Sequence, residues 1–191
     1  QYRDFLRQEV GYEGLIISYE PDPNNIKSLQ QQSKSDDLWV IESCALGNSA
    51  ETLKLNVMES SVFNSFLAPD ESHTNIFKSH NTVKTEIDVS VQRLDEVYPN
   101  LQRTYGFYHP FLKLDTQGFD LNVLEGASGC IESIRGVQTE ISVLPIYDNM
   151  PTFNESICAF KAAGFEVSGI YAISEDRFPH AVEFDCILLP R

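Results

Sequence analysis

The fold of this chain is decided by the stretch Phe111-Leu112-Lys113-Leu114-Asp115-Thr116-Gln117-Gly118-Phe119-Asp120-Leu121-Asn122-Val123-Leu124-Glu125-Gly126-Ala127. Its apolar opening is typical of a buried strand, and Gly118 lets the chain turn after that strand. The spacing of Leu121, Val123, Leu124 and Ala127 then fits a helix packed on a sheet. The stretch therefore predicts a strand, a turn and a helix, in that order.

Asp115 stands where the predicted strand ends. In open α/β sheets, ligands bind in the crevice outside the carboxyl ends of the strands, so a carboxylate at this place is a candidate site residue. The structural alternative is that Asp115 only caps the helix that follows. The pattern alone leaves both interpretations open.

On both sides of this stretch, predicted strands and helices alternate along the chain. This order predicts a doubly wound, mostly parallel sheet within one α/β domain over residues 1–191. In the last predicted strand, apolar residues alternate with Glu183 and Asp185, which suits an antiparallel ending. Besides the strand and helix of the opening stretch, the predicted strands are 15–20, 38–46, 52–58, 83–91, 137–143, 165–173 and the last strand, 181–189. The other predicted helices are 2–10, 26–32, 94–101 and 153–164.

Residues 59–82 show no clear period and are rich in Ser, Asn, Pro and His. A long irregular connection in a compact domain is often functional, so we interpret this segment as a loop or lid, with a mobile insertion as the alternative. The histidines, at positions 73, 80, 109 and 180, have no metal-ligand spacing, and we interpret them first as surface residues. His73 and His80 flank the loop and His109 precedes the central strand, so these three are weak candidates for a proton acceptor.

Composition limits the partners of the chain. Its 191 residues suffice for one domain with a substantial core. With 14 Lys and Arg against 28 Asp and Glu, the formal charge of -14 opposes non-specific binding to nucleic acid or to anionic membranes. No apolar run approaches the roughly 20 residues that span a bilayer, so we expect no stable membrane insertion.

The cysteines are Cys44, Cys130, Cys158 and Cys186, which are far apart and include no Cys-x-x-Cys pair. This spacing indicates neither a zinc site nor a disulfide framework. Free thiols in a reducing cytoplasm are the expected state.

Glu20 closes an early predicted strand. In nucleotide-binding α/β folds, an acid at this place accepts hydrogen bonds from both ribose hydroxyls. The alternative is an acid held in a turn by Asn24 or Asn25. No glycine-rich turn precedes the first helix, because Gly11 and Gly14 come after it.

With these residues laid out, the chain resembles the FkbM family of S-adenosylmethionine-dependent O-methyltransferases. Residues 17–23 resemble the Glu-Pro segment of the family, and Ala45-Leu46-Gly47 resembles its third-strand ending. Leu94-Asp95-Glu96 is similar to a Leu-Asp-acid step of the family, and residues 112–127 are similar to its signature. Glu140, Tyr147 and the ending Phe184-Asp185-Cys186-Ile187 follow in the expected order.

The resemblance implies a Rossmann-like class I methyltransferase fold with an antiparallel last strand. It implies that Glu20, in the Glu20-Pro21 pair, binds the ribose of S-adenosylmethionine, and that Cys44 and Ala45 border the adenine. The first strand of the family and its Gly-x-Asn-x-Gly loop would precede Gln1, so the chain is expected to be truncated at its amino end.

The resemblance also implies that Asp115 lies near the methionine end of the cofactor and near the acceptor. Many members carry Glu where this chain has Gln117, so Gln117 is assigned a positioning role. The hypothesis is methyl transfer to a hydroxyl of a small or glycosidic acceptor, with Asp115 as the first candidate catalytic residue and Glu140 as the second. A nucleotide-dependent oxidoreductase and a non-catalytic binding module of the same fold are the alternatives.

Overall fold

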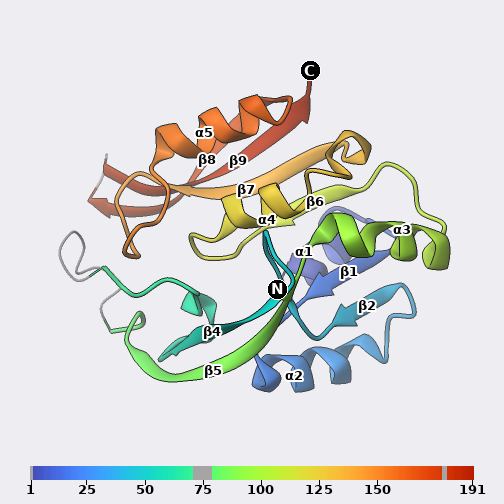
Figure 1. Cartoon of the computed structure of the whole chain (residues 1–191), viewed down its shortest axis with the longest axis horizontal. Coiled ribbons are helices and arrows are strands. Elements are labelled where there is room, and N and C mark those ends of the chain that lie inside the picture. The colour runs from blue at the N-terminus through green and yellow to red at the C-terminus, as the bar shows by residue number, and fades with distance from the viewer. Residues whose placement is uncertain (1, 71–78, 178–179) are drawn as a thin grey trace. The chain divides into compact units, whose positions relative to one another are not determined.

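The computed structural model describes residues 2–70, 79–177 and 180–191, and the side chains of these residues outside 174–180. The chain divides into two compact units, Gln1–Ala45 and Leu46–Arg191. Figure 1 labels the helices and strands of both units.

The first unit contains two parallel strands and two helices. Strand β1 pairs with β2 in a register that places Ile16 opposite Trp39 and Tyr19 opposite Glu42. Asp22 caps α2, because its side chain accepts a hydrogen bond from the backbone N–H of Asn24 at 2.8 Å. The elements are α1 (Tyr2–Gln8), β1 (Ile16–Tyr19), α2 (Pro23–Ser33) and β2 (Trp39–Glu42).

Helix α1 is attached to this pair of strands through its arginines. Arg7 and Arg3 both contact the Asp36 carboxylate at 2.9 Å. The guanidinium of Arg3 also lies 5.0 Å from the centre of the buried Trp39 ring, a cation-π distance. These contacts stabilise the position of an otherwise poorly buried helix.

The second unit is built around a mixed four-stranded sheet with the order β6-β7-β9-β8. Strands β6 and β7 are parallel, whereas β9 runs antiparallel to both β7 and β8. The elements of this unit are β4 (Glu51–Met58), η1 (Ser61–Phe63), β5 (Val83–Gln92), α3 (Leu94–Tyr105), β6 (Phe111–Leu114), α4 (Asp120–Gly126), η2 (Ile131–Ser133), β7 (Gly136–Ser142), α5 (Phe153–Ala162), β8 (Phe165–Arg177) and β9 (His180–Pro190).

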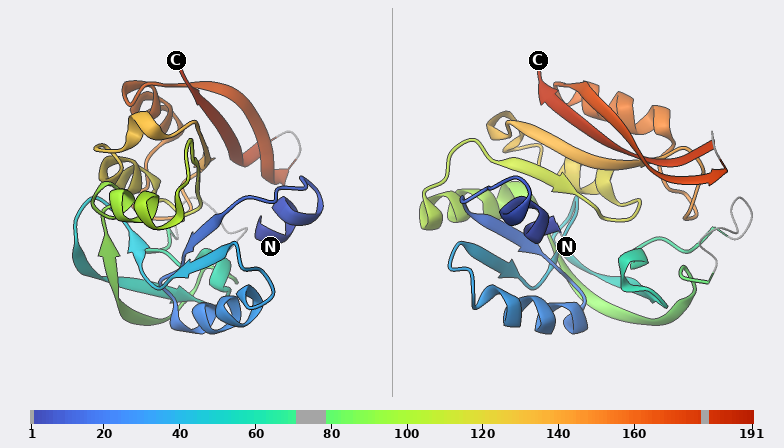
Figure 2. Two further views of the ribbon diagram at one scale, coloured as in Figure 1. Left: turned by 90° about the vertical axis from the view of Figure 1, so that its right-hand side faces the viewer. Right: turned by 180° about the vertical axis from the view of Figure 1, so that it is seen from behind.

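One face of the four-stranded sheet is covered by helices. The left view of Figure 2 shows α4 and α5, coloured yellow and orange, on one side of the strands. Because side chains alternate along a strand, Val137, Thr139 and Ile141 of β7 lie on that face and are buried. Gln138 and Glu140 therefore point to the opposite face. This alternation gives the sheet an apolar side and a polar side.

The other strands of the second unit form an antiparallel pair, in which Glu51 of β4 lies opposite Val91 of β5. The short strand β3 (Ala45–Leu46) stands at the boundary of the two units, in a sheet of order β3-β5-β4. A Cβ atom at Gly126 would lie 1.9 Å from the carbonyl oxygen of Gly47, so the end of α4 requires a glycine there.

The structure confirms the strand and helix of the opening stretch and the antiparallel last strand. It corrects the expectation of a mostly parallel sheet, because the sheets are mixed. The predicted strand 38–46 is interrupted between β2 and β3, and α3 continues past Leu101 to Tyr105 despite Pro99 within it. Among the described residues, no helix has the length and apolar character needed to cross a membrane.

Candidate functional site

Asp115 and Glu140 meet at one edge of the four-stranded sheet. In the parallel register of β6 and β7, Leu114 pairs with Thr139. The residues that follow this pair, Asp115 after β6 and Glu140 in β7, therefore stand at matching positions of the two chain segments. The carboxyl ends of parallel strands face the same edge of a sheet, where α/β proteins place their ligands. The two acids predicted for catalysis are therefore brought together.

Asp115 does not cap the helix that follows. Helix α4 begins after Phe119, and no side chain caps it. The Asp115 side chain is 49% exposed and lies 3.3 Å from the Lys113 ammonium group. The capping alternative is thus excluded, and the half-exposed carboxylate is accessible to a molecule arriving from solvent.

Asp120 is the acid that fixes this turn, and the sequence pattern did not single it out. Its carboxylate is buried and accepts hydrogen bonds from the Thr116 backbone N–H at 3.0 Å and from the Thr116 hydroxyl. The Thr139 hydroxyl donates to its second oxygen at 3.0 Å. Burial raises the pKa of Asp120, against the effect of these donors. Asp120 therefore joins the turn to β7.

Glu140 has an unusual electrostatic environment. Burial first, and the charge of Asp115 second, raise the pKa of Glu140 to about 8, whereas the nearby Lys113 lowers it. The acids Glu183 and Asp185 on the neighbouring β9 act in the same direction as Asp115. The raised pKa favours the protonated form of Glu140, in which the carboxyl group can donate a hydrogen bond.

Gln117 bridges the two acids. Its side-chain Nε2 lies 3.1 Å from Asp115 Oδ1 and 3.3 Å from Glu140 Oε2. The backbone of Gln117 is in the left-handed region, with φ of 51°. The Gln117 amide thus lies between the two acids, and its positioning role stays a prediction.

Lys113 and Asp185 complete the polar face of the sheet, and no role was predicted for either residue from the sequence. Burial by itself lowers the pKa of Lys113, but the charges of Asp115, Glu140 and Asp185 raise it above its ordinary value. Asp185 lies directly opposite Glu140 in the β7-β9 register. A usable signal was present for Lys113, which is the single charge in an apolar strand and is spaced two residues from Asp115.

The described part of the predicted lid, residues 59–70 and 79–82, packs against the segment 144–150 of the same unit. The backbone N–H of Asp70 donates to the Ile146 carbonyl at 2.9 Å, and that of Asp148 donates to the Ala68 carbonyl at 2.8 Å. Tyr147 is buried between these segments, beside Met58 and Val182. The lid interpretation also involves residues 71–78, which lie outside the described residues, and it stays a prediction.

In the first unit, Glu20 follows β1 at the carboxyl edge of the parallel pair. Its Oε1 accepts a hydrogen bond from the Asp22 N–H at 2.8 Å, and its Oε2 accepts one from Asn25 Nδ2 at 3.3 Å. Burial raises the pKa of Glu20. The turn contacts of the alternative interpretation are present, and each carboxylate oxygen keeps a further acceptor position for a ligand hydroxyl.

The predicted adenine contacts follow the neighbouring strand. Cys44 and Ala45 are buried and come shortly after β2 ends at Glu42. The backbone N–H of Glu20 donates to the Glu42 carbonyl at 3.0 Å, so both segments leave the strand pair at the same edge. Burial, with the charge of Glu42 second, raises the pKa of the Cys44 thiol to about 11, which keeps it protonated and apolar.

Two of the four histidines have described side chains. The His80 ring is stacked on Phe63 with 6.3 Å between ring centres, and His109 accepts a hydrogen bond from Arg135 Nε at 2.9 Å. His73 and the side chain of His180 lie outside the described part of the chain. In the described part, no group of three or more His, Cys, Asp or Glu side chains could hold a metal ion.

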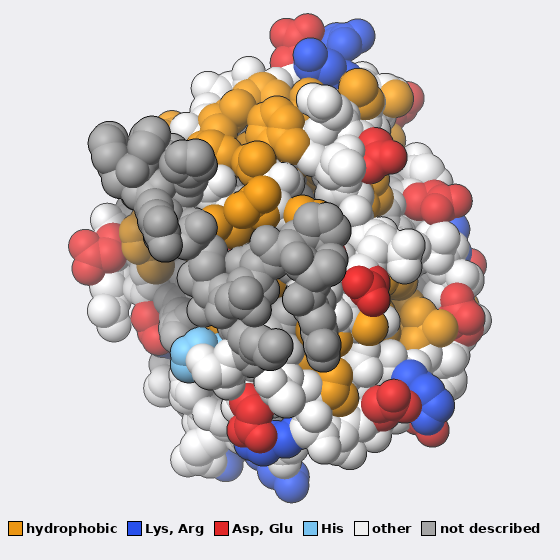
Figure 3. All heavy atoms as spheres, turned by 90° about the vertical axis from the view of Figure 1, so that its left-hand side faces the viewer, with side chains coloured by type: hydrophobic (Ala, Val, Ile, Leu, Met, Phe, Trp, Pro, Cys, Tyr) orange, Lys and Arg blue, Asp and Glu red, His pale blue; other side chains and the backbone are white. Residues whose placement is uncertain are grey.

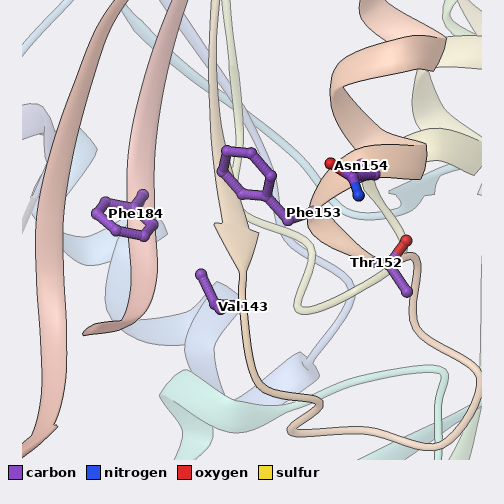
Figure 4. A pocket seen from close by; sticks show the side chains of 5 residues that line it. All are labelled: Val143, Thr152, Phe153, Asn154 and Phe184. Carbon is purple, nitrogen blue, oxygen red and sulfur yellow. The ribbon is translucent and has the colours of Figure 1, made fainter. Parts of the chain in front are cut away.

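An open hollow of about 410 Å³ lies on the helix-covered face, lined by Val143, Thr152, Phe153, Asn154 and Phe184. Figure 4 shows these side chains around the start of α5 and the ends of β7 and β9. In Figure 3, hydrophobic side chains gather in the upper part of the view, at the level where Figure 1 shows α5, β8 and β9. Phe184 lies opposite Ile141 in the register, so the hollow is across the sheet from Glu140.

One family profile and one solved structure match this chain. Residues 2–167 match the profile of the methyltransferase FkbM domain. A search of curated proteins gave no significant match.

A solved structure, that of methyltransferase FkbM from Methylobacillus flagellatus KT, is similar with a TM-score of 0.51 and 13% sequence identity. The match covers 92% of this chain but only 36% of that protein chain. At this identity the likeness concerns the fold alone.

Proposed function

Since this chain belongs to the methyltransferase FkbM family, we propose that it is an S-adenosylmethionine-dependent methyltransferase acting on a hydroxyl group of a small-molecule or glycosidic acceptor. The observation that carries the proposal is the family match over residues 2–167. The edge positions of the candidate residues support it, because two parallel strand pairs each present an acid at their carboxyl ends.

We assign the cofactor contacts to Glu20, Pro21, Cys44 and Ala45. The chemistry of these residues fits the cofactor, because the Glu20 carboxylate retains acceptor positions for ribose hydroxyls and the buried Ala45 offers an apolar surface for adenine. Bound S-adenosylmethionine would supply the electrophilic methyl group.

We assign the acceptor side to Asp115, Gln117 and Glu140. The acceptor oxygen must lose its proton as it gains the methyl group, and the exposed Asp115 carboxylate is suited to receive this proton. Glu140 would orient the acceptor as a hydrogen-bond donor, since its raised pKa favours the protonated carboxyl group. Gln117 keeps the two carboxyl groups at fixed places by donating to both.

Cofactor binding is tested by calorimetry of the protein with S-adenosylhomocysteine and, separately, with NAD. Heat with S-adenosylhomocysteine alone supports the proposal, and its loss in Glu20→Gln but not in Glu9→Gln supports the ribose assignment. Glu9 is a suitable control because it is an exposed acid in the same unit. Heat with NAD alone would favour an oxidoreductase, and heat with neither would favour a non-catalytic module.

The acceptor side is tested by measuring methyl transfer to hydroxylated acceptors by the Asp115→Asn variant. We expect the rate to fall by about 10² to 10⁴, the usual contribution of a general base. Asp88→Asn is the control, because this carboxylate on β5 is 69% exposed and far in sequence from the site. Equal rates for the wild type and Asp115→Asn would remove Asp115 from the chemistry.

The proposal includes two broader statements from the sequence. We propose that residues 1–191 act as a single methyltransferase domain and that the protein works in the cytoplasm. The free cysteines support the second statement, since Cys44, Cys130 and Cys186 are buried as thiols. We propose no nucleic acid partner, in line with the charge of -14.

A further inference from the structure

Gln117 is held on three sides, although it stands in a turn. The Ser65 hydroxyl donates to its backbone carbonyl at 2.7 Å. The Tyr147 hydroxyl lies 2.9 Å from its side-chain Oε1. Its Nε2 faces Asp115 and Glu140. Gln117 has a left-handed backbone and is held by several contacts, so its side-chain amide has a fixed orientation. This fixed orientation favours a functional role for the amide.

The orientation of the Gln117 amide has a chemical consequence. With Nε2 toward the carboxyl groups, the amide offers each of them an N–H donor. Turned by half a revolution, the amide would present Oε1 to the Asp115 carboxylate oxygen, which is unfavourable because both atoms are acceptors. The Tyr147 hydroxyl stabilises the first orientation, since it can donate to Oε1.

Tyr147 is itself fixed by its surroundings. Its side chain is 1% exposed and packs in the hydrophobic cluster of Met58, Ile146 and Val182. The hydroxyl also lies 2.9 Å from the Phe63 carbonyl, so it is held between two acceptors. A buried ring of this kind places its hydroxyl with little freedom to move.

We propose that Tyr147 is a positioning residue of the active site: by donating to Gln117 Oε1, it keeps the amide N–H groups directed at Asp115 and Glu140. This inference rests on the proposed function, in which the two carboxyl groups serve the acceptor. Tyr147 does not touch the acceptor and acts only through Gln117. Removing its hydroxyl lets the amide turn and withdraws the donors from both acids.

The protonation of Glu140 is the readout. An N–H donor stabilises the ionised carboxylate, so withdrawing it should raise the pH at which Glu140 titrates. The other groups that face Glu140 are Lys113, Asp115, Glu183 and Asp185, and they are unchanged when Tyr147 loses only its hydroxyl. The titration therefore isolates the effect of the amide.

The experiment is a carbon-13 NMR titration of the glutamate carboxyl groups, with the Glu140 signal assigned by its loss in Glu140→Gln. In Tyr147→Phe we expect the Glu140 midpoint to rise by roughly half a unit to one unit of pH, the equivalent of one neutral hydrogen bond. Tyr98→Phe is the matched control. Tyr98 is buried in the same unit, and its hydroxyl has no hydrogen-bond partner among the described residues.

A second variant keeps the test decisive if Tyr147→Phe folds poorly. Gln117→Met removes the amide and should raise the Glu140 midpoint at least as far. Tyr147→Phe added to Gln117→Met should then shift it no further, because the tyrosine acts through the amide. A Glu140 midpoint unchanged in Gln117→Met, or in a folded Tyr147→Phe, would overturn the inference.

These measurements use neither cofactor nor acceptor, so they do not depend on methyl transfer by the protein. A wild-type protein that binds no S-adenosylhomocysteine would overturn the proposed function and leave the titration result standing. Conversely, normal cofactor binding with an unmoved Glu140 midpoint would overturn only the role of Tyr147.

Discussion

Replacing Glu140 by Gln should change how the stability of the second unit depends on pH. Gln keeps the size and the acceptor oxygen of Glu140 but cannot ionise. In the wild type, burial raises the pKa of Glu140 from the ordinary 4.5 to about 8. Between these two pH values the folded protein holds a proton that the unfolded chain releases, so the free energy of unfolding should fall as pH rises.

The magnitude follows from the difference in pKa between the folded and unfolded states. At about 1.4 kcal/mol per pKa unit, moving the pKa of Glu140 from 4.5 to about 8 corresponds to about 5 kcal/mol. The side chain is 22% exposed, so solvent reduces the effect and we expect about 3 to 5 kcal/mol. The stabilisation is fully present below pH 4.5 and is lost as pH passes through 8. Above pH 8, Glu140→Gln should therefore be the more stable protein.

Amide hydrogen exchange of β7 and β9, corrected for the intrinsic rate at each pH, is the suitable assay. Tryptophan fluorescence would not serve, because the single Trp39 belongs to the first unit. Subtracting the wild-type profile from that of Glu140→Gln cancels the contributions of acids such as Asp95, whose pKa is lowered mainly by the Arg93 side chain. Profiles that run parallel from pH 5 to pH 9 would refute the reasoning.

Two further predictions concern other parts of the second unit. Gly126→Ala should lower the free energy of unfolding, measured by urea denaturation, by several kcal/mol, because the added Cβ would lie 1.9 Å from the Gly47 carbonyl oxygen. Gly106→Ala should lower it by only about 1 to 2 kcal/mol, because a Cβ there meets open space and only the φ of 66° is unfavourable. Equal losses in the two variants would contradict this packing argument. Lys113→Met should raise the NMR titration midpoint of Glu140, because it removes a positive charge that stabilises the Glu140 carboxylate. Asp185→Asn should lower this midpoint, because it removes a negative charge that repels the carboxylate. Shifts in the same direction would refute the charge assignment.

The sequence was most informative where a local pattern fixes a local structure. The apolar run before Asp115 predicted β6, and the spacing of Leu121 and Leu124 predicted α4. Thr152 and Glu155 form a capping box at the start of α5, a motif that is visible in the sequence as Thr-x-x-Glu. These features depend on neighbours within a few residues, so the pattern contains the necessary information.

The arrangement of the sheets could not be read in the same way. Alternation of polar and apolar residues identified β9, but it does not say that β9 lies between β7 and β8. The sequence also does not show which acid, Asp115 or Asp120, accepts the hydrogen bonds that hold the turn. This choice is decided by Thr139, which approaches from another strand and donates to Asp120.

The presence of Gln rather than Glu at position 117 becomes understandable from the charges around it. Asp115, Glu140 and Asp185 surround the half-buried Lys113, and Glu183 adds a further negative charge near Glu140. A carboxylate at position 117 would add a like charge within hydrogen-bond distance of two acids and would remove both N–H donors. The amide instead joins these acids, and its oxygen finds a donor in Tyr147. The absence of an ionisable group at position 117 is therefore compatible with an acceptor site built on Asp115 and Glu140.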